Sequence, residues 1–99
     1  MHMNTYNELK MLYGAYIGVS SMDNYKTKEY VLKKIDDEIK KHIEKNNMYY
    51  YEEVLAEAKK QTLITDLQDS LYILKQLNES LELSLLIKEK IRNLKDSGE

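Results

Sequence analysis

Histidine and carboxylate side chains are the first candidates for chemistry, because they bind metal ions and transfer protons. The chain has two histidines, His2 and His42, which lie far apart in the sequence. A di-iron helical site needs Glu-x-x-His spacing, whereas Glu38 precedes His42 by four residues and Ile39 occupies the required position. Cysteine is absent, so thiolate ligands are excluded. We therefore expect no metal ion and no other cofactor.

Two weaker arrangements of titratable groups remain open. Glu38 lies one helical turn before His42 and could tune a proton switch, although a boundary histidine bonded to that carboxylate or to water explains the same pattern. Glu53 and Glu57 would share one helical face, where a desolvated pair could carry out acid–base chemistry. With Lys60 nearby, the same pair is typical of a solvated face, and we favour that interpretation.

Covalent catalysis lacks the residues that it needs. None of the six serines lies in a glycine-framed elbow with a base in reach. With three glycines and no proline, the chain cannot build a phosphate-binding loop. We therefore expect a protein that is not an enzyme and has no small-molecule substrate.

Lysines gather in residues 26–45, which hold seven lysines and five acidic residues. Heptad and adjacent spacings place five of the lysines on one face: Lys26, Lys33, Lys34, Lys40 and Lys41. Such a face could follow a nucleic-acid backbone, with tyrosines stacking on bases. However, acidic residues precede several of these lysines by four positions, which stabilises a solvated helix and neutralises its charge. Nucleic-acid binding is therefore the alternative function, and the net charge of −2 does not favour it.

Tyrosine supplies every aromatic ring, because the nine tyrosines are accompanied by no phenylalanine or tryptophan. Tyr49, Tyr50 and Tyr51 cannot all face one core, since successive helical residues are about 100° apart. We expect Tyr51 to join the core and Tyr50 to have no structural role in the monomer. Tyrosine is enriched at protein interfaces, so this stretch is a candidate contact surface.

Leucines at heptad-like spacing form a second candidate surface, consisting of Leu67, Leu71, Leu74, Leu81 and Leu85. Together with the adjacent tyrosines, they predict a non-enzymatic interaction or regulatory protein. We expect it to form a homodimer or to dock on another protein through these surfaces.

Helix signals dominate the elements that must position these residues. The absence of proline and the scarcity of glycine favour long helices with short polar connections. Apolar stripes and candidate caps predict about four helices, at residues 5–17, 27–45, 48–77 and 79–95. Thr65 with Gln68 fits a capping box, so a further break near residues 61–65 is an alternative. Residues 80–87, "SLELSLLI", alternate as a strand does, but their helical flanks favour a helix. The prediction is an all-α bundle forming one domain over residues 1–99, with an intertwined dimer as an alternative arrangement.

Two glycines of the first predicted helix have different expected roles. Gly14 lies inside the helix and costs about 1 kcal/mol relative to alanine. Such a glycine indicates close approach of another backbone, or a local kink. Gly18 lies where a left-handed C-terminal cap is expected.

Localisation and origin rest on broader features. No apolar run approaches the ~20 residues that span a membrane, and the N-terminus lacks a signal pattern. We therefore expect no membrane association and a cytoplasmic protein, in a host cell if the source is a virus. The composition is similar to that of small orphan proteins of phages and archaeal viruses, which gives a weaker alternative for its role.

Overall fold

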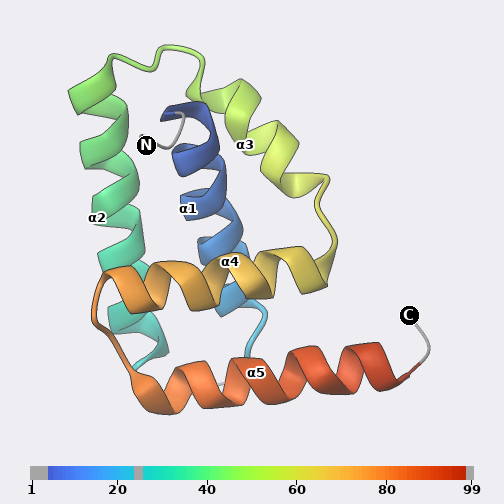
Figure 1. Ribbon diagram of the computed structural model, residues 1–99. Helices are drawn as coiled ribbons and strands as arrows, with labels where there is room; N and C mark the ends of the chain where they lie inside the picture. Colours follow the sequence, from blue (N-terminus) through green and yellow to red (C-terminus); the bar gives the residue numbers. More distant parts are fainter. Residues whose placement is uncertain (1–4, 24–25, 98–99) are drawn as a thin grey trace.

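Five helices account for most of the chain in the computed structural model, which describes residues 5–23 and 26–97 (Figure 1). They are α1 (Thr5–Ser20), α2 (Lys28–Asn46), α3 (Tyr51–Lys59), α4 (Leu63–Gln76) and α5 (Leu81–Asp96). No strand occurs among these described residues, so the all-α prediction is confirmed. Residues 81–87, where the strand pattern was strongest, belong to α5.

The single helix predicted over residues 48–77 is wrong, because residues 60–62 divide it into α3 and α4. Thr62 has extended backbone angles (φ −72°, ψ 157°), and its hydroxyl accepts a hydrogen bond from the Thr65 backbone N–H. This N-cap satisfies a donor that would otherwise lack a partner at the start of α4. The capping threonine is therefore Thr62, whereas the sequence pattern had favoured Thr65.

The predicted break near residues 76–79 is confirmed. Asn78 adopts a left-handed conformation (φ 57°), which a helix cannot continue through. Ser80 then caps α5 by accepting a hydrogen bond from the Leu83 backbone N–H at 3.1 Å. Asn47 ends α2 in the same left-handed conformation (φ 50°), close to the predicted helix end at residue 45.

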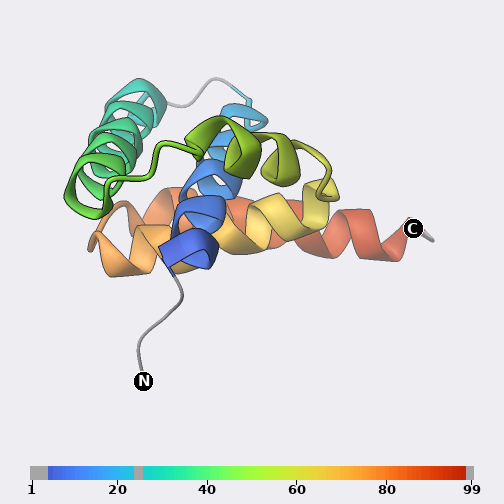
Figure 2. The same ribbon diagram turned by 90° about the horizontal axis from the view of Figure 1, so that it is seen from above.

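α1 occupies the centre of the fold and packs against α2, α3 and α4, while α5 packs against α4. α1 and α2 run in opposite directions side by side, and the antiparallel pair α4–α5 lies across them (Figure 1). Seen from above, α4 and α5 superpose, so α5 forms the end of the molecule farthest from the α2–α3 connection (Figure 2). The radius of gyration is 13.3 Å, close to the ~13 Å of a compact chain this long.

The core is built from the inward stripe of every helix. Residues at three- and four-residue spacing lie on one helical face, so each helix contributes a short row of buried aliphatic side chains. The largest fully buried side chains are Leu9, Val19, Val31, Ile35, Met48, Val54, Leu67, Leu74, Leu83 and Ile87. No tyrosine of the described chain is fully buried, although Tyr6 and Tyr13 pack against the core as partly buried side chains.

α1 and α4 approach closely where α1 carries its glycines. Gly18 is buried within α1, which continues to Ser20, so the predicted C-terminal cap is wrong. A Cβ added at Gly18 would collide with the Ser70 hydroxyl and lie 2.5 Å from the Asp66 carbonyl oxygen. Ser70 donates its hydroxyl proton towards the carbonyls of Ala15 and Asp66, at 3.0 and 2.9 Å. The glycine thus admits the α4 backbone, and the serine bonds the two helices together.

Two carboxylates of α4 lie beside this contact. The side-chain amide of Gln61 donates hydrogen bonds to Asp66 at 2.8 Å and to Asp69 at 3.1 Å. Burial raises the pKa of both carboxyls, and the Gln61 hydrogen bonds oppose that effect. For Asp69, the charge of Asp66 raises the pKa further, while Lys10 lowers it.

Replacing Asp69 with asparagine is expected to stabilise the protein at neutral pH and to lose that advantage in acid. A carboxyl whose pKa is raised by folding binds its proton more tightly in the folded state, so its ionised form destabilises the fold at neutral pH. That destabilisation disappears as the pH falls below the raised pKa towards the ordinary value of 3.8. Urea unfolding at several pH values measures the difference between Asp69→Asn and the wild type. A difference that is independent of pH would contradict the prediction.

Candidate protein-interaction surface

An open groove of about 730 Å³ runs between the antiparallel helices α4 and α5. Leu71 and the fully buried Leu74 contribute apolar side chains from α4. At its edges, Tyr72 is 41% exposed and Leu81 is 75% exposed. Leu85, one helical turn after Leu81, is 55% exposed and extends the apolar surface along α5. We call Leu71, Tyr72, Leu81 and Leu85 the α4–α5 apolar face, and the buried Leu74 lies beneath it at the floor of the groove.

The alternating leucines of α5 explain why apolar side chains remain exposed there. Residues two apart on a helix point about 200° away from one another. Leu83 and Ile87 are fully buried, so Leu81 and Leu85 necessarily lie on the opposite side of the helix. The pattern that resembled a strand is therefore a helix with leucine on two faces.

Two of the five predicted surface leucines are core residues. Leu67 and Leu74 are fully buried, because the inward face of α4 packs against α1 and α5. They therefore cannot provide exposed contact area. Leu71, Leu81 and Leu85 retain surface exposure or line the groove.

The three adjacent tyrosines lie elsewhere, at the connection between α2 and α3. Tyr49 is 88% exposed, and Tyr50 and Tyr51 are 43% and 41% exposed. The expected core position of Tyr51 is wrong, since the buried residue of this connection is Met48. Burial raises the pKa of Tyr13, and the nearby Tyr51, Asp36 and Glu52 raise it further. The tyrosines and the α4–α5 apolar face lie at opposite ends of the fold and form separate surfaces (Figure 1).

Most of the predicted lysine face carries compensated charge. Lys34 forms an ion pair with Glu79, which raises the lysine pKa and ties α2 to the α4–α5 connection. Lys40 pairs with Asp36 at 2.9 Å and Lys41 with Glu38 at 3.5 Å. Lys26 and Lys33 are exposed. The face therefore presents fewer uncompensated charges than its lysine count indicated.

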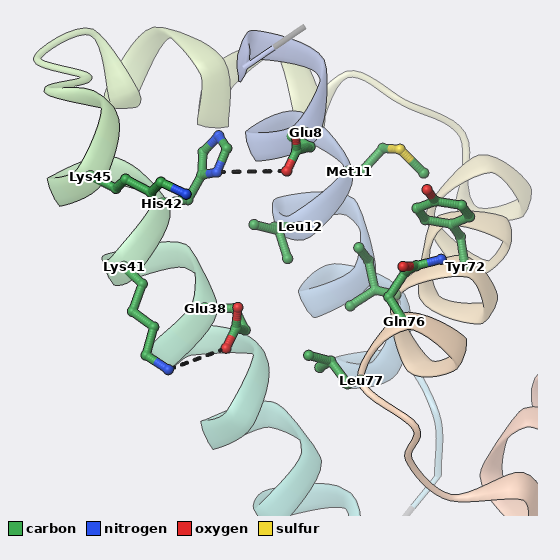
Figure 3. Close-up of a pocket in the computed structure, with 11 residues that line it drawn as sticks. Glu8, Met11, Leu12, Glu38, Lys41, His42, Lys45, Tyr72, Gln76 and Leu77 are labelled. Carbon is green, nitrogen blue, oxygen red and sulfur yellow. Dashed lines mark ion pairs between the residues drawn. The ribbon is translucent and has the colours of Figure 1, made fainter. Parts of the chain in front are cut away.

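His42 lines a second groove, of about 530 Å³, between α1, α2 and α4 (Figure 3). Its Nε2–H donates to the Thr5 carbonyl oxygen at 2.9 Å, and its Nδ1 lies 3.9 Å from the Glu8 carboxylate. The expected partner Glu38 pairs with Lys41 instead, so the predicted His42–Glu38 arrangement is wrong. Glu8 was missed because it comes from another helix, and no local spacing records that contact.

The other candidate sites from the sequence do not bring reactive groups together within the described residues. Glu53 and Glu57 are exposed, and Glu57 pairs with Lys60 at 3.4 Å, as expected for a solvated face. Within the described residues, no cluster of three or more histidines or carboxylates could hold a metal ion. No described helix is long and apolar enough to cross a membrane. His2 lies outside the residues that the structure describes.

Comparison with known proteins adds no family to these observations. No protein-family model matches the sequence, and searches of curated proteins and of solved structures find no significant match. The α4–α5 apolar face is therefore assigned from its own geometry.

Proposed function

We propose that the protein is a non-enzymatic interaction module that docks a protein partner on the α4–α5 apolar face. The observation that carries this proposal is the exposure of Leu81 and Leu85 beside an apolar groove. Contiguous exposed apolar surface is unfavourable in water, so it marks a site that another molecule covers. Grooves between packed helices are a common way of receiving an apolar segment of a partner.

Three features of the groove support docking over catalysis. Its floor is aliphatic, from Leu71 and Leu74, and its edge carries the amphipathic ring of Tyr72. Its single carboxylate, Glu79, is already paired with Lys34. Of its two serines, Ser80 uses its hydroxyl oxygen to cap α5, and within the described residues Ser84 forms no hydrogen bond to a base that would activate it.

Replacing Leu81 and Leu85 together with serine is expected to weaken partner binding by at least about tenfold without unfolding the protein. Both side chains are largely exposed, so little core packing is lost. The measurement begins with selection of binders from a library of short displayed peptides. Affinities of the selected peptides for the wild type and the double variant are then compared by fluorescence anisotropy.

Leu63→Ser is the matched control, because Leu63 is a partly exposed leucine at the other end of α4. It should leave peptide affinity unchanged. Failure to select any peptide that depends on Leu81 and Leu85 would contradict the proposed function. Selected ligands that depend instead on Lys33 and Lys40 and bind nucleic acid competitively would favour the lysine-face alternative.

A further inference from the structure

We propose that the occupant of the α4–α5 apolar face is an acidic amphipathic helix of a partner protein, held by Lys75 and Lys88. This inference rests on the proposed function and specifies the partner's chemistry. It places leucine-like side chains of the partner in the groove and carboxylates beside them on the partner's flanks.

The two lysines stand on opposite walls of the groove. Lys75 belongs to α4 and Lys88 to α5, and both are exposed where they line it. Within the described residues, neither lysine forms an ion pair, in contrast to Lys34, Lys40 and Lys41 on α2. The remaining charge in the groove is Glu79, which is neutralised by Lys34.

A groove with an apolar floor and a lysine on each wall is matched by a partner that has apolar side chains flanked by carboxylates. The apolar face of a helix would cover Leu71 and Leu81, and carboxylates at its edges would reach Lys75 and Lys88. Complementary charge at the rim raises the association rate and fixes the orientation of the bound helix. A basic helix would meet two like charges in the same place, so the groove discriminates between partners by charge.

A second copy of this chain fits the face less well. The outer stripe of α5 continues from Leu81 and Leu85 into Lys88 and Arg92, at spacings of four, three and four residues. A parallel two-fold pairing would place each of these cations against its own counterpart along the seam. An antiparallel pairing centred on Leu85 would place acidic residues of the same flank opposite each other.

These acidic residues are Glu82 and Glu89, one turn on either side of Leu85 on one flank of α5. Like charges facing each other across a helix pair are unfavourable. Both symmetric pairings thus bring like charges together along α5. A separate acidic helix seated in the groove meets Lys75 and Lys88 instead, because Glu82 and Glu89 do not line the groove.

The experiment uses two synthetic helical peptides that share a leucine stripe. One has glutamates beside the stripe, and in the other each glutamate is replaced by lysine. Anisotropy titration of the labelled peptides on the wild type should show at least about tenfold tighter binding of the glutamate peptide at low salt. Added salt should weaken that binding. Lys75→Glu with Lys88→Glu should reverse the preference.

Lys33→Glu with Lys59→Glu is the matched control, since it makes the same change in net charge at two exposed lysines outside the groove. It should leave the preference for the glutamate peptide in place. The Leu81→Ser, Leu85→Ser double variant should lose affinity for both peptides.

Equal affinity for the two peptides, lost on replacement of the leucines, would overturn the acidic-partner inference and leave the docking function standing. Absence of binding by the glutamate peptide would also overturn the inference. A free protein that sediments as a dimer, and becomes monomeric on replacement of Leu81 and Leu85, would assign the face to a second copy. Failure of the separate peptide selection would remove the docking function itself.

Discussion

Gly18→Ala is expected to lower the free energy of unfolding by about 3 kcal/mol, a large effect for a single methyl group. The new Cβ would lie 2.5 Å from the carbonyl oxygen of Asp66 and 2.9 Å from its carbonyl carbon, and would collide with Ser70. Backbone atoms cannot rotate away as a flexible side chain does. α4 must therefore move away from α1, and the Ser70 bond to Ala15 is weakened at the same time.

Gly14→Ala is the matched control, because it adds the same methyl group one helical turn earlier. There, the close neighbours are the Asp69 carboxylate and the Gln61 amide, both side-chain ends that can rotate away. Alanine also gains about 1 kcal/mol of helix propensity over glycine. We expect a net change within about 1 kcal/mol, although displacement of the Gln61–Asp69 hydrogen bond contributes a cost.

Chemical unfolding of both variants separates steric collision from helix propensity. If helix propensity dominated, both alanine variants would be more stable than the wild type. If any substitution in α1 disturbed the fold, both variants would be destabilised equally. Only close approach of the α4 backbone predicts a large loss at Gly18 and a small change at Gly14. Equal losses in the two variants would contradict this account of the helix contact.

Much of the secondary structure could be predicted because its signals are local. The apolar stripe predicted a helix over residues 27–45, and α2 spans Lys28–Asn46 with Val31, Ile35 and Ile39 buried. The left-handed asparagines at positions 47 and 78 lie within two residues of the predicted helix ends at residues 45 and 77. Such features depend on side chains within one or two turns, so the sequence displays them directly.

Features that depend on contacts between helices were predicted less well. Gly18 has the local pattern of a helix cap, and only the approach of α4 makes it an interior position. His42 finds Glu8 across the α1–α2 contact and leaves its neighbour Glu38 to Lys41. Periodicity marks the apolar side of a helix, but it cannot say whether another helix or a partner covers it.

The leucines of α4 and α5 show this limit most clearly. Leu67 and Leu81 looked equivalent in the heptad-like pattern, yet Leu67 is fully buried and Leu81 is 75% exposed. Their difference arises because α1 packs on the Leu67 side of α4, whereas Leu81 faces away from the buried stripe of α5. Leucines of one heptad-like pattern can therefore be a core residue at position 67 and a surface residue at position 81.

Leu67→Ala is accordingly expected to destabilise the protein by about 2–5 kcal/mol, through lost apolar burial and a residual cavity. Leu81→Ala should change the unfolding free energy by no more than about 0.5 kcal/mol, because an exposed leucine gives up little packing. Urea unfolding measures both effects. Peptide affinity should respond in the opposite order, with Leu81→Ala weakening binding while Leu67→Ala, wherever it remains folded, binds as the wild type does. If Leu81→Ala destabilises the monomer as strongly as Leu67→Ala, that leucine belongs to the core and the α4–α5 apolar face is not a free surface.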